Sequence, residues 1–292
     1  MALRNDAATL AAFVWVTLGV SPTHSEEFAS PRFVNGVAIG VVAAGSEFTC
    51  GVLESGGVRC WGRNDVGQLG NENQIISATP GSRTQLAVRS ITSAIAVTAG
   101  GAHACALLTS GGVRCWGRNS NGQLGDGTTN NSFVPTTVTG LGTLTSQVSA
   151  VSAGDQHTCA IVVNPVSLSP PSVRCWGSNA YGQLGRGTTG GDFSTPAVVP
   201  GTSGAIAVAA GGRHSCAVLA TRAVVCWGFN GNGQLGDGTT TQRNTATTAV
   251  TGINTAWVVT AGAAHTCAGL QGGGPFQCWG DNGLGRLGNG GL

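Results

Sequence analysis

Charged residues are scarce in this 292-residue chain, and those that are present do not cluster. Only 9% of the residues are charged, lysine is absent, and the 14 arginines are scattered among 12 acidic residues. A protein that binds nucleic acid needs enough cations on one face to displace counterions from several phosphates. Because no basic run occurs, the sequence predicts no nucleic-acid partner.

Long apolar runs are also missing, as are the residue types of long helices. After Val20 no stretch reaches the roughly 18–20 apolar residues that span a bilayer. The 49 glycines and the single methionine are typical of short strands joined by tight turns. We therefore predict an all-β fold without stable membrane insertion.

What the sequence does contain is one motif, repeated five times. The copy at residues 99–128 reads AGGAHACALLTSGGVRCWGRNSNGQLGDGT, and the other copies begin at Ala44, Ala153, Ala210 and Ala261. The first cysteines of successive copies lie 51 to 57 residues apart, a period typical of propellers and solenoids. Each copy contains an apolar strand ending in Ala-Gly, a strand through the first cysteine and a strand ending in Cys-Trp-Gly. With one further strand in each unit, the sequence predicts a β-propeller of five four-stranded antiparallel blades.

The repeats also set the expected domain organisation. Residues 1–25 are predicted to be a signal peptide, because Arg4 precedes a mostly apolar stretch and small residues follow Pro22. A disordered leader or a wrongly assigned start codon is the alternative. We assign residues 26–292 to the propeller and interpret residues 135–140 as the strand that opens a unit. The blades then run approximately over residues 30–77, 78–132, 133–193, 194–244 and 245–292.

A loop of the form Gly-x-Asn-x-x-Gly-Gln-Leu-Gly follows each Cys-Trp strand. Its glycines suit positive φ and close backbone approach, and its Asn side chain can bond local amides. A phosphate-binding loop would need a following helix N-terminus, and here another strand follows. We therefore interpret the loop as structural. Its leucines are predicted to pack between neighbouring blades: Leu69, Leu124, Leu184, Leu235 and Leu287.

Together these elements resemble the regulator of chromosome condensation repeat, in its secreted, bacterial-type form with paired cysteines. Units of that family carry the same His-x-x-Ala-Leu, Val-x-x-Trp-Gly and Gly-Gln-Leu-Gly elements, and the resemblance runs from about Ser30 to the C-terminus. It implies a β-propeller, and members of the family commonly have seven blades. The functions it implies are diverse, since the family includes nuclear exchange factors, enzyme-inhibitory secreted propellers and binding modules.

The ten cysteines occur as two in each repeat. Cys105 and Cys115 enclose a hairpin with a three-residue turn at 109–111, which places them opposite each other in antiparallel strands. The hairpin of the third repeat is longer by six residues, an even number that keeps its cysteines opposed. We predict five intra-blade disulfides and a secreted, periplasmic or cell-surface protein, with buried thiols as the alternative. The expected pairs are Cys50–Cys60, Cys105–Cys115, Cys159–Cys175, Cys216–Cys226 and Cys267–Cys278.

The longer hairpin of the third repeat, residues 164–172, contains Pro165, Pro170 and Pro171. Prolines suit an exposed loop rather than the middle of a sheet. This hairpin is therefore predicted to protrude.

A histidine lies two residues before the first cysteine in four repeats, at His103, His157, His214 and His265. A zinc site of His and Cys ligands is therefore conceivable. In the first repeat Phe48 holds this position, which indicates a space-filling role. We predict neither a metal nor a cofactor.

No nucleophile–base pair and no paired carboxylates form a recognisable catalytic set, so the sequence predicts that the chain is not an enzyme. The preferred hypothesis is a non-catalytic, secreted or cell-surface binding module for a protein or a glycan. Two alternatives stay open: a guanine-nucleotide exchange factor for a small GTPase, suggested by the resemblance alone, and an enzyme with its active site at the channel mouth.

The residues around the Asn of each loop differ between repeats and are the candidate binding residues. Arginine and aromatic side chains supply much of the energy of protein interfaces. This singles out Arg63, Arg118, Tyr181 and Phe229. Neutral drift on a solvated rim would produce the same variation.

Overall fold

The computed structural model describes residues 32–34, 37–39, 41–72, 81–246, 248–272 and 276–291. The predicted signal peptide lies outside these residues. In the described part of the chain, every pair of neighbouring strands is antiparallel. No helix in this part is both long enough and apolar enough to cross a membrane.

Five sheets follow one another along the chain, and within each sheet the strands lie side by side in sequence order. Sheet 1 contains β3 (Val42–Ala44), β4 (Phe48–Val52), β5 (Val58–Arg63) and β6 (Gly81–Ala87). Sheet 2 contains β7 (Ala94–Ala99), β8 (His103–Leu108), β9 (Val113–Gly117) and β10 (Ser132–Thr137). Sheet 3 contains β11 (Gln147–Ala153), β12 (His157–Val163), β13 (Ser172–Ser178) and β14 (Asp192–Val198).

Sheets 4 and 5 have three strands each in the described part of the chain, instead of the predicted four. Sheet 4 contains β15 (Ala205–Ala210), β16 (His214–Leu219) and β17 (Val224–Gly228). Sheet 5 contains β18 (Ala256–Ala261), β19 (His265–Leu270) and β20 (Gln277–Gly280). At the outer edge of sheet 4, Arg243 and Ala249 form single bridges to Gly228 and Val225, and bends in the segment between them prevent a continuous ladder.

The outermost strand of each four-stranded sheet follows the Gly-Gln-Leu-Gly loop, which corrects the predicted unit boundaries. The loop reverses the chain, so β10 returns along the edge of its own sheet, with Thr136 opposite Cys115, and does not open sheet 3. Similarly, β1 (Arg32–Val34) pairs with β2 (Val37–Ile39) as a separate two-stranded sheet and does not belong to sheet 1. The sheets therefore span residues 42–87, 94–137, 147–198, 205–249 and 256–280.

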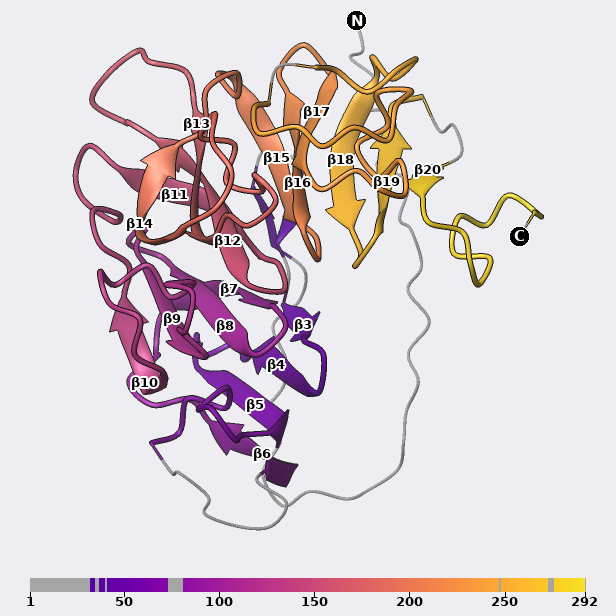
Figure 1. Cartoon of the computed structure of the whole chain (residues 1–292). Helices are drawn as coiled ribbons and strands as arrows, with labels where there is room; N and C mark the ends of the chain where they lie inside the picture. Colours follow the sequence, from indigo (N-terminus) through magenta and orange to yellow (C-terminus); the bar gives the residue numbers. More distant parts are fainter. Residues whose placement is uncertain are drawn as a thin grey trace, which may run out of the picture.

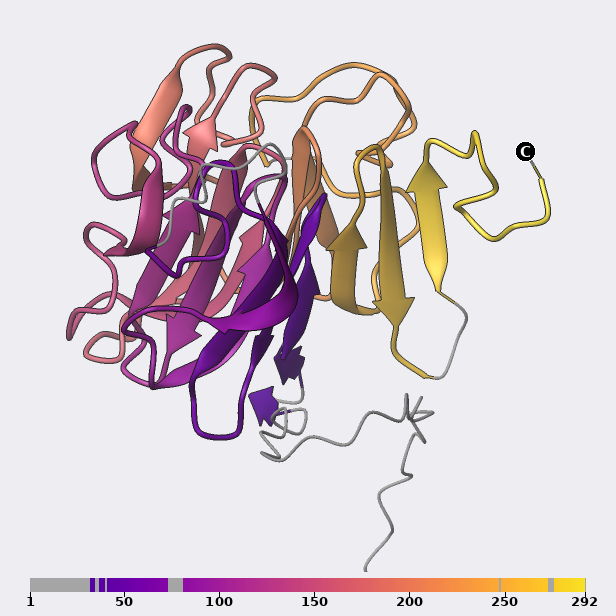
Figure 2. The ribbon, with the colours of Figure 1, turned by 90° about the horizontal axis from the view of Figure 1, so that it is seen from below.

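The five sheets are arranged around an arc that is open between sheet 1 and sheet 5 (Figure 1). The first strand of each sheet contacts the first strand of the next, from β3 through β7, β11 and β15 to β18. Seen from below, sheet 5 again lies at one end of the row of sheets (Figure 2). The fold is thus an all-β propeller whose described blades do not close into a ring.

The hydrophobic core lies between successive sheets rather than within one of them. Leu69, from the loop that follows β5, belongs to the same buried cluster as Trp116 of sheet 2. Leu124 and Leu184 pack in the same way with the tryptophans of the next sheets. The predicted packing between blades is therefore confirmed for these leucines and for Leu235, all at most 1% exposed. Leu287 is only partly buried, because sheet 5 ends the arc.

Candidate binding face

All ten cysteines are bonded in the predicted pairs, with Cα–Cα distances of 4.0 to 4.1 Å. The partners lie directly opposite each other in neighbouring strands, including Cys159 and Cys175, which flank the longer hairpin. The cysteines of sheets 1 to 4 are at most 2% exposed, whereas Cys267 and Cys278 of sheet 5 are partly exposed. Since each cysteine is bonded to another, the alternatives of buried thiols and of cysteine ligands for zinc do not hold.

Three histidines connect one sheet to the next. The Nε2 atoms of His103, His157 and His214 lie 2.8 to 2.9 Å from the hydroxyl oxygens of Thr158, Ser215 and Thr266. Each hydroxyl donates to the carbonyl oxygen of the Gln in a Gly-Gln-Leu-Gly loop, at 2.9 Å. That hydroxyl can therefore only accept from the imidazole, so Nε2 carries the proton.

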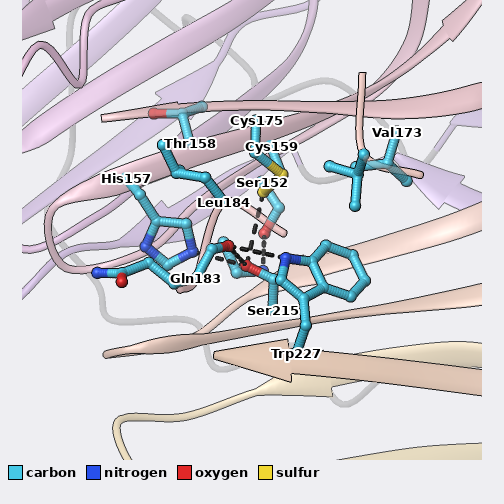
Figure 3. Close-up of a disulfide and its surroundings, with 12 residues drawn as sticks. Ser152, His157, Thr158, Cys159, Val173, Cys175, Gln183, Leu184, Ser215 and Trp227 are labelled. Atoms are coloured by element: carbon cyan, nitrogen blue, oxygen red, sulfur yellow. Dashed lines mark hydrogen bonds between the residues drawn. A yellow bond between two sulfur atoms is a disulfide. The ribbon is translucent and has the colours of Figure 1, made fainter. Parts of the chain in front are cut away.

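The tryptophan of the following sheet shares the same carbonyl. Trp227 Nε1 donates to Gln183 O at 2.8 Å, beside the Ser215 hydroxyl and close to His157 (Figure 3). Trp176 and Trp279 make the corresponding bonds to Gln123 and Gln234. These buried groups thus form a repeated structural junction between sheets.

The histidines are fully buried, and their burial sets their protonation. Burial lowers the pKa of His103 and of His214 to about 4, and that of His157 to about 3. Within the described residues no group of three or more His, Cys, Asp or Glu could hold a metal ion. These imidazoles are therefore neutral hydrogen-bond donors at neutral pH.

The first junction has lost both polar partners together. Phe48 replaces the histidine, and Ala104 of sheet 2 replaces the hydroxyl residue opposite it. Both are buried, at 4% and 0% exposed. An apolar pair thus substitutes for the hydrogen-bonded pair, in agreement with the predicted space-filling role.

The Asn-containing loop is fixed by its own side chains. Asn Oδ1 accepts the backbone N–H of the Leu five residues later in every repeat, at 2.9 to 3.1 Å. The loop lies so close to the next sheet that a Cβ on Gly125, which has a φ of 71°, would be 2.6 Å from Trp176 Nε1. The variable residues beside the Asn are therefore held on a rigid frame.

The candidate binding residues lie at one end of the sheets, together with the loops that precede the second strands. The residue before each Asn donates its backbone N–H to the carbonyl of the residue before the histidine position, at 2.9 Å in every sheet. These pairs are Arg63–Glu47, Arg118–Ala102, Ser178–Gln156, Phe229–Arg213 and Asp281–Ala264. We call the surface formed by both sets of loops the loop face.

The four predicted residues fall into two groups on this face. Arg63 and Arg118 line one cavity of about 280 Å³ that is formed by loops of sheets 1, 2 and 3. Tyr181 and Phe229 contact each other edge to face, with ring centroids 5.2 Å apart, and the Arg213 guanidinium lies 4.8 Å above the Tyr181 ring.

Three residues of the loop face were not predicted from the sequence. Glu47 and Asp155 line the same cavity as the arginines, and Arg213 covers Tyr181. All three lie in the two positions that precede the histidine position of each repeat. Those positions also differ from repeat to repeat, and this was the signal available in the sequence.

Comparison with protein families gives matches along most of the described sheets. A model of the Regulator of chromosome condensation (RCC1) repeat matches residues 55–107, 110–161 and 172–218. A second model of this repeat matches residues 41–68, 94–123 and 205–234. Together the matches cover more than half of the chain.

Several relatives carry the same repeats within longer proteins. The probable E3 ubiquitin-protein ligase HERC4 of Mus musculus is 32% identical over 217 residues, which are 73% of this chain and 19% of that protein. The ultraviolet-B receptor UVR8 of Arabidopsis thaliana is 32% identical over 211 residues, which are 72% of this chain and 45% of the receptor. The chain thus spans less than half the length of either relative.

Solved structures show the same fold. Human WBSCR16 has a TM-score of 0.72 and 22% identity, covering 86% of this chain and 64% of that one. Yeast RCC1 (Prp20), solved with Kap60, has a TM-score of 0.66 and 19% identity, covering 82% of this chain and 56% of that one. The predicted β-propeller of this repeat type is therefore confirmed.

These relatives correct the prediction that the chain is not an enzyme. The prediction was based on the lack of a recognisable catalytic set, yet proteins named as E3 ubiquitin-protein ligases share the repeats. The exclusion is therefore wrong, because the missing motif does not separate this chain from proteins that are named as enzymes.

Proposed function

Because the chain belongs to the Regulator of chromosome condensation (RCC1) repeat family, we propose that it is a secreted or cell-surface binding module whose loop face recognises a protein. The observation that carries this proposal is the contrast between a repeated frame and variable side chains on the loop face. The Asn, Leu and disulfide contacts recur in all five repeats. The residues beside them change from arginine to serine, phenylalanine and aspartate.

The disulfides support the proposed location. Five bonded pairs require an oxidising compartment during folding, as is found outside the cytosol. The same requirement disfavours exchange of nucleotide on a cytosolic or nuclear GTPase.

Two observations favour a protein over a glycan as the partner. Arg213 covers one face of Tyr181 and Phe229 contacts its edge, which leaves a compact aromatic and cationic cluster typical of protein interfaces. In addition, the structurally similar yeast protein Prp20 was solved bound to the protein Kap60 and was studied for its binding to Gsp1p and histones.

Capture of partners by the oxidised chain tests this proposal. We expect Tyr181→Ala and Phe229→Ala to weaken the binding of a captured protein by about 1–2 kcal/mol each, because large planar side chains supply much of an interface's energy. Leu144→Ala and Leu168→Ala are matched controls, since both side chains are exposed, at 82% and 105%, on loops away from the loop face. If the loop-face variants bind the partner as tightly as the wild-type chain and the control variants bind it more weakly, the recognition surface lies on the loops of Leu144 and Leu168 instead.

A further inference from the structure

Arg63 and Arg118 occupy the same position in sheets 1 and 2, but only Arg63 is neutralised. Its guanidinium forms ion pairs with Glu47 and with Asp65, the latter at 2.6 Å. These bonds raise the pKa of Arg63 above its usual value, with the bond to Asp65 as the largest cause. The charged groups of Arg63, Glu47 and Asp65 are therefore already paired with one another.

Arg118 lacks both acidic partners, because Ala102 stands where sheet 1 has Glu47 and Ser120 stands where it has Asp65. Its Nε donates to Ser120 Oγ at 2.9 Å. Among the described residues it forms no ion pair, and its side chain is exposed. The two Nη groups are thus available as a planar fork, the geometry that binds a carboxylate through two hydrogen bonds.

The same cavity is also lined by a carboxylate that forms no ion pair in the described part of the chain. Asp155, in the loop between β11 and β12, lines the cavity together with Arg118. It leans toward sheet 2, since a Cβ on Gly101 would lie 3.0 Å from Asp155 Oδ1. Its side chain is exposed and has no ion pair within the described part of the chain.

We propose that this cavity binds a protein segment in which an acidic side chain stands near a basic one. Arg118 binds the carboxylate and Asp155 binds the ammonium or guanidinium group. The Arg63–Glu47–Asp65 cluster beside them has a net charge of −1, and its three charged groups are already paired with one another. A volume of about 280 Å³ admits the ends of two side chains. The assignment to a protein segment rests on the proposed function, whereas the pairing of charges rests on the cavity alone.

Labelled peptide pools test the charge pairing directly by fluorescence anisotropy at low ionic strength. Each pool is a Gly/Ser peptide with a central Glu and one Lys placed at any of the flanking positions, and control pools carry Gln for Glu or Gln for Lys. We expect the wild-type chain to bind the Glu/Lys pool about tenfold more tightly than either control pool, which is near the lower end of the coupling measured for close charge pairs across interfaces. If both control pools bind as tightly as the Glu/Lys pool, the chain does not recognise the pair of charges, and the proposal is overturned.

Variants assign each charge. Arg118→Ala is expected to remove the discrimination between Glu and Gln, Arg118→Lys to restore it only in part, and Asp155→Asn to remove the discrimination between Lys and Gln. Arg83→Ala is the charge-matched control, because it removes an arginine of β6 that does not line the cavity, and it keeps both preferences. Unchanged discrimination in a folded Arg118→Ala variant, with its thermal unfolding intact, also overturns the proposal.

The two proposals fail in different ways. In one outcome, a captured protein depends on Tyr181 and Phe229 for binding but not on Arg118 or Asp155. That result overturns the charge-pairing subsite and still supports the binding module. Peptide discrimination that requires Arg118, in a chain that captures no protein, supports the subsite and contradicts the proposed function.

Discussion

At the scale of single residues, the buried histidines hold the sheets together only while they are uncharged. His103, His157 and His214 donate from Nε2, and their Nδ1 atoms have no hydrogen-bond partner in the part of the chain described. Protonation would place a positive charge and an unsatisfied N–H in the core. This explains why burial lowers the pKa of each of them far below 6.5.

Stability is therefore expected to fall as the pH decreases from about 6.5 toward about 4. In this range the unfolded chain binds protons on these histidines and the folded chain does not, so protonation favours unfolding. With up to three protons taken up on unfolding, the free energy of unfolding should change by up to about 4 kcal/mol per pH unit. Urea unfolding at a series of pH values measures this slope.

The His157→Gln variant is the control for that measurement. It should lower the number of protons taken up on unfolding by about one, whatever its effect on stability at neutral pH. Depressed carboxylate pKa values, such as that of Asp237, contribute only below about pH 5, so the histidine slope is measured between about pH 6.5 and pH 5. A flat stability profile between these pH values would contradict the neutral state of the three imidazoles.

The apolar pair at the first junction gives a second prediction. Phe48→His alone buries an imidazole against Ala104, whose methyl cannot accept its proton, and should destabilise the chain by about 1–3 kcal/mol. In the double variant with Ala104→Thr, the new hydroxyl can accept from the histidine and donate to Gln68 O, so part of that loss should be recovered. A double-mutant cycle by urea unfolding measures the coupling, and purely additive effects would contradict the pairing.

At the scale of elements, the third hairpin protrudes as predicted. Residues 165–170 are all exposed, with Val166 at 73% and Leu168 at 105%. The Pro171 carbonyl accepts Gly204 N–H, directly before β15 of sheet 4, at 2.7 Å, and the pairing within sheet 3 begins at Val162 and Ser172. The loop is therefore attached at its base alone.

Deletion of residues 165–170 should leave thermal stability nearly unchanged. The cut lies beyond Val162 and Ser172, the last pair of β12 and β13, so Cys159 and Cys175 stay opposed, and no described contact outside the hairpin is lost. Differential scanning calorimetry of the oxidised protein checks this expectation. A large loss of thermal stability would show that the hairpin packs against the rest of the molecule.

The pairing within each hairpin could be predicted from the sequence. Which sheet each outermost strand joins could not. The opposed cysteines follow from the hairpin lengths alone. The outermost strands, such as β10, were assigned to the wrong unit because they are separated from their partners by the Asn loop, and only the reversal of the chain there decides which edge they join. Likewise, the free state of Arg118 depends on Ala102, a residue 16 positions earlier in another loop.

At the scale of the whole molecule, the open arc leaves two end sheets that are less covered than the three between them. Val42 in β3 is 51% exposed and Trp257 in β18 is 36% exposed, whereas the tryptophans of sheets 2 to 4 are fully buried. Amide hydrogens of β8, β12 and β16 should therefore exchange more slowly than those of β19, because local opening requires less buried contact to be lost at an end. Hydrogen-exchange mass spectrometry measures this, and uniform protection across the sheets would contradict it.

The junctions between sheets all run in one direction, and this has a consequence for synthesis. The carbonyl of Gln183 belongs to a loop that leaves the ribosome before Ser215 and Trp227, which bind to it. The same order holds at the junctions built on Gln123 and Gln234. Each acceptor loop is thus translated before the sheet that binds to it. The sheets can therefore pack one at a time as the chain emerges, because no junction depends on a segment that is translated after both of its sheets.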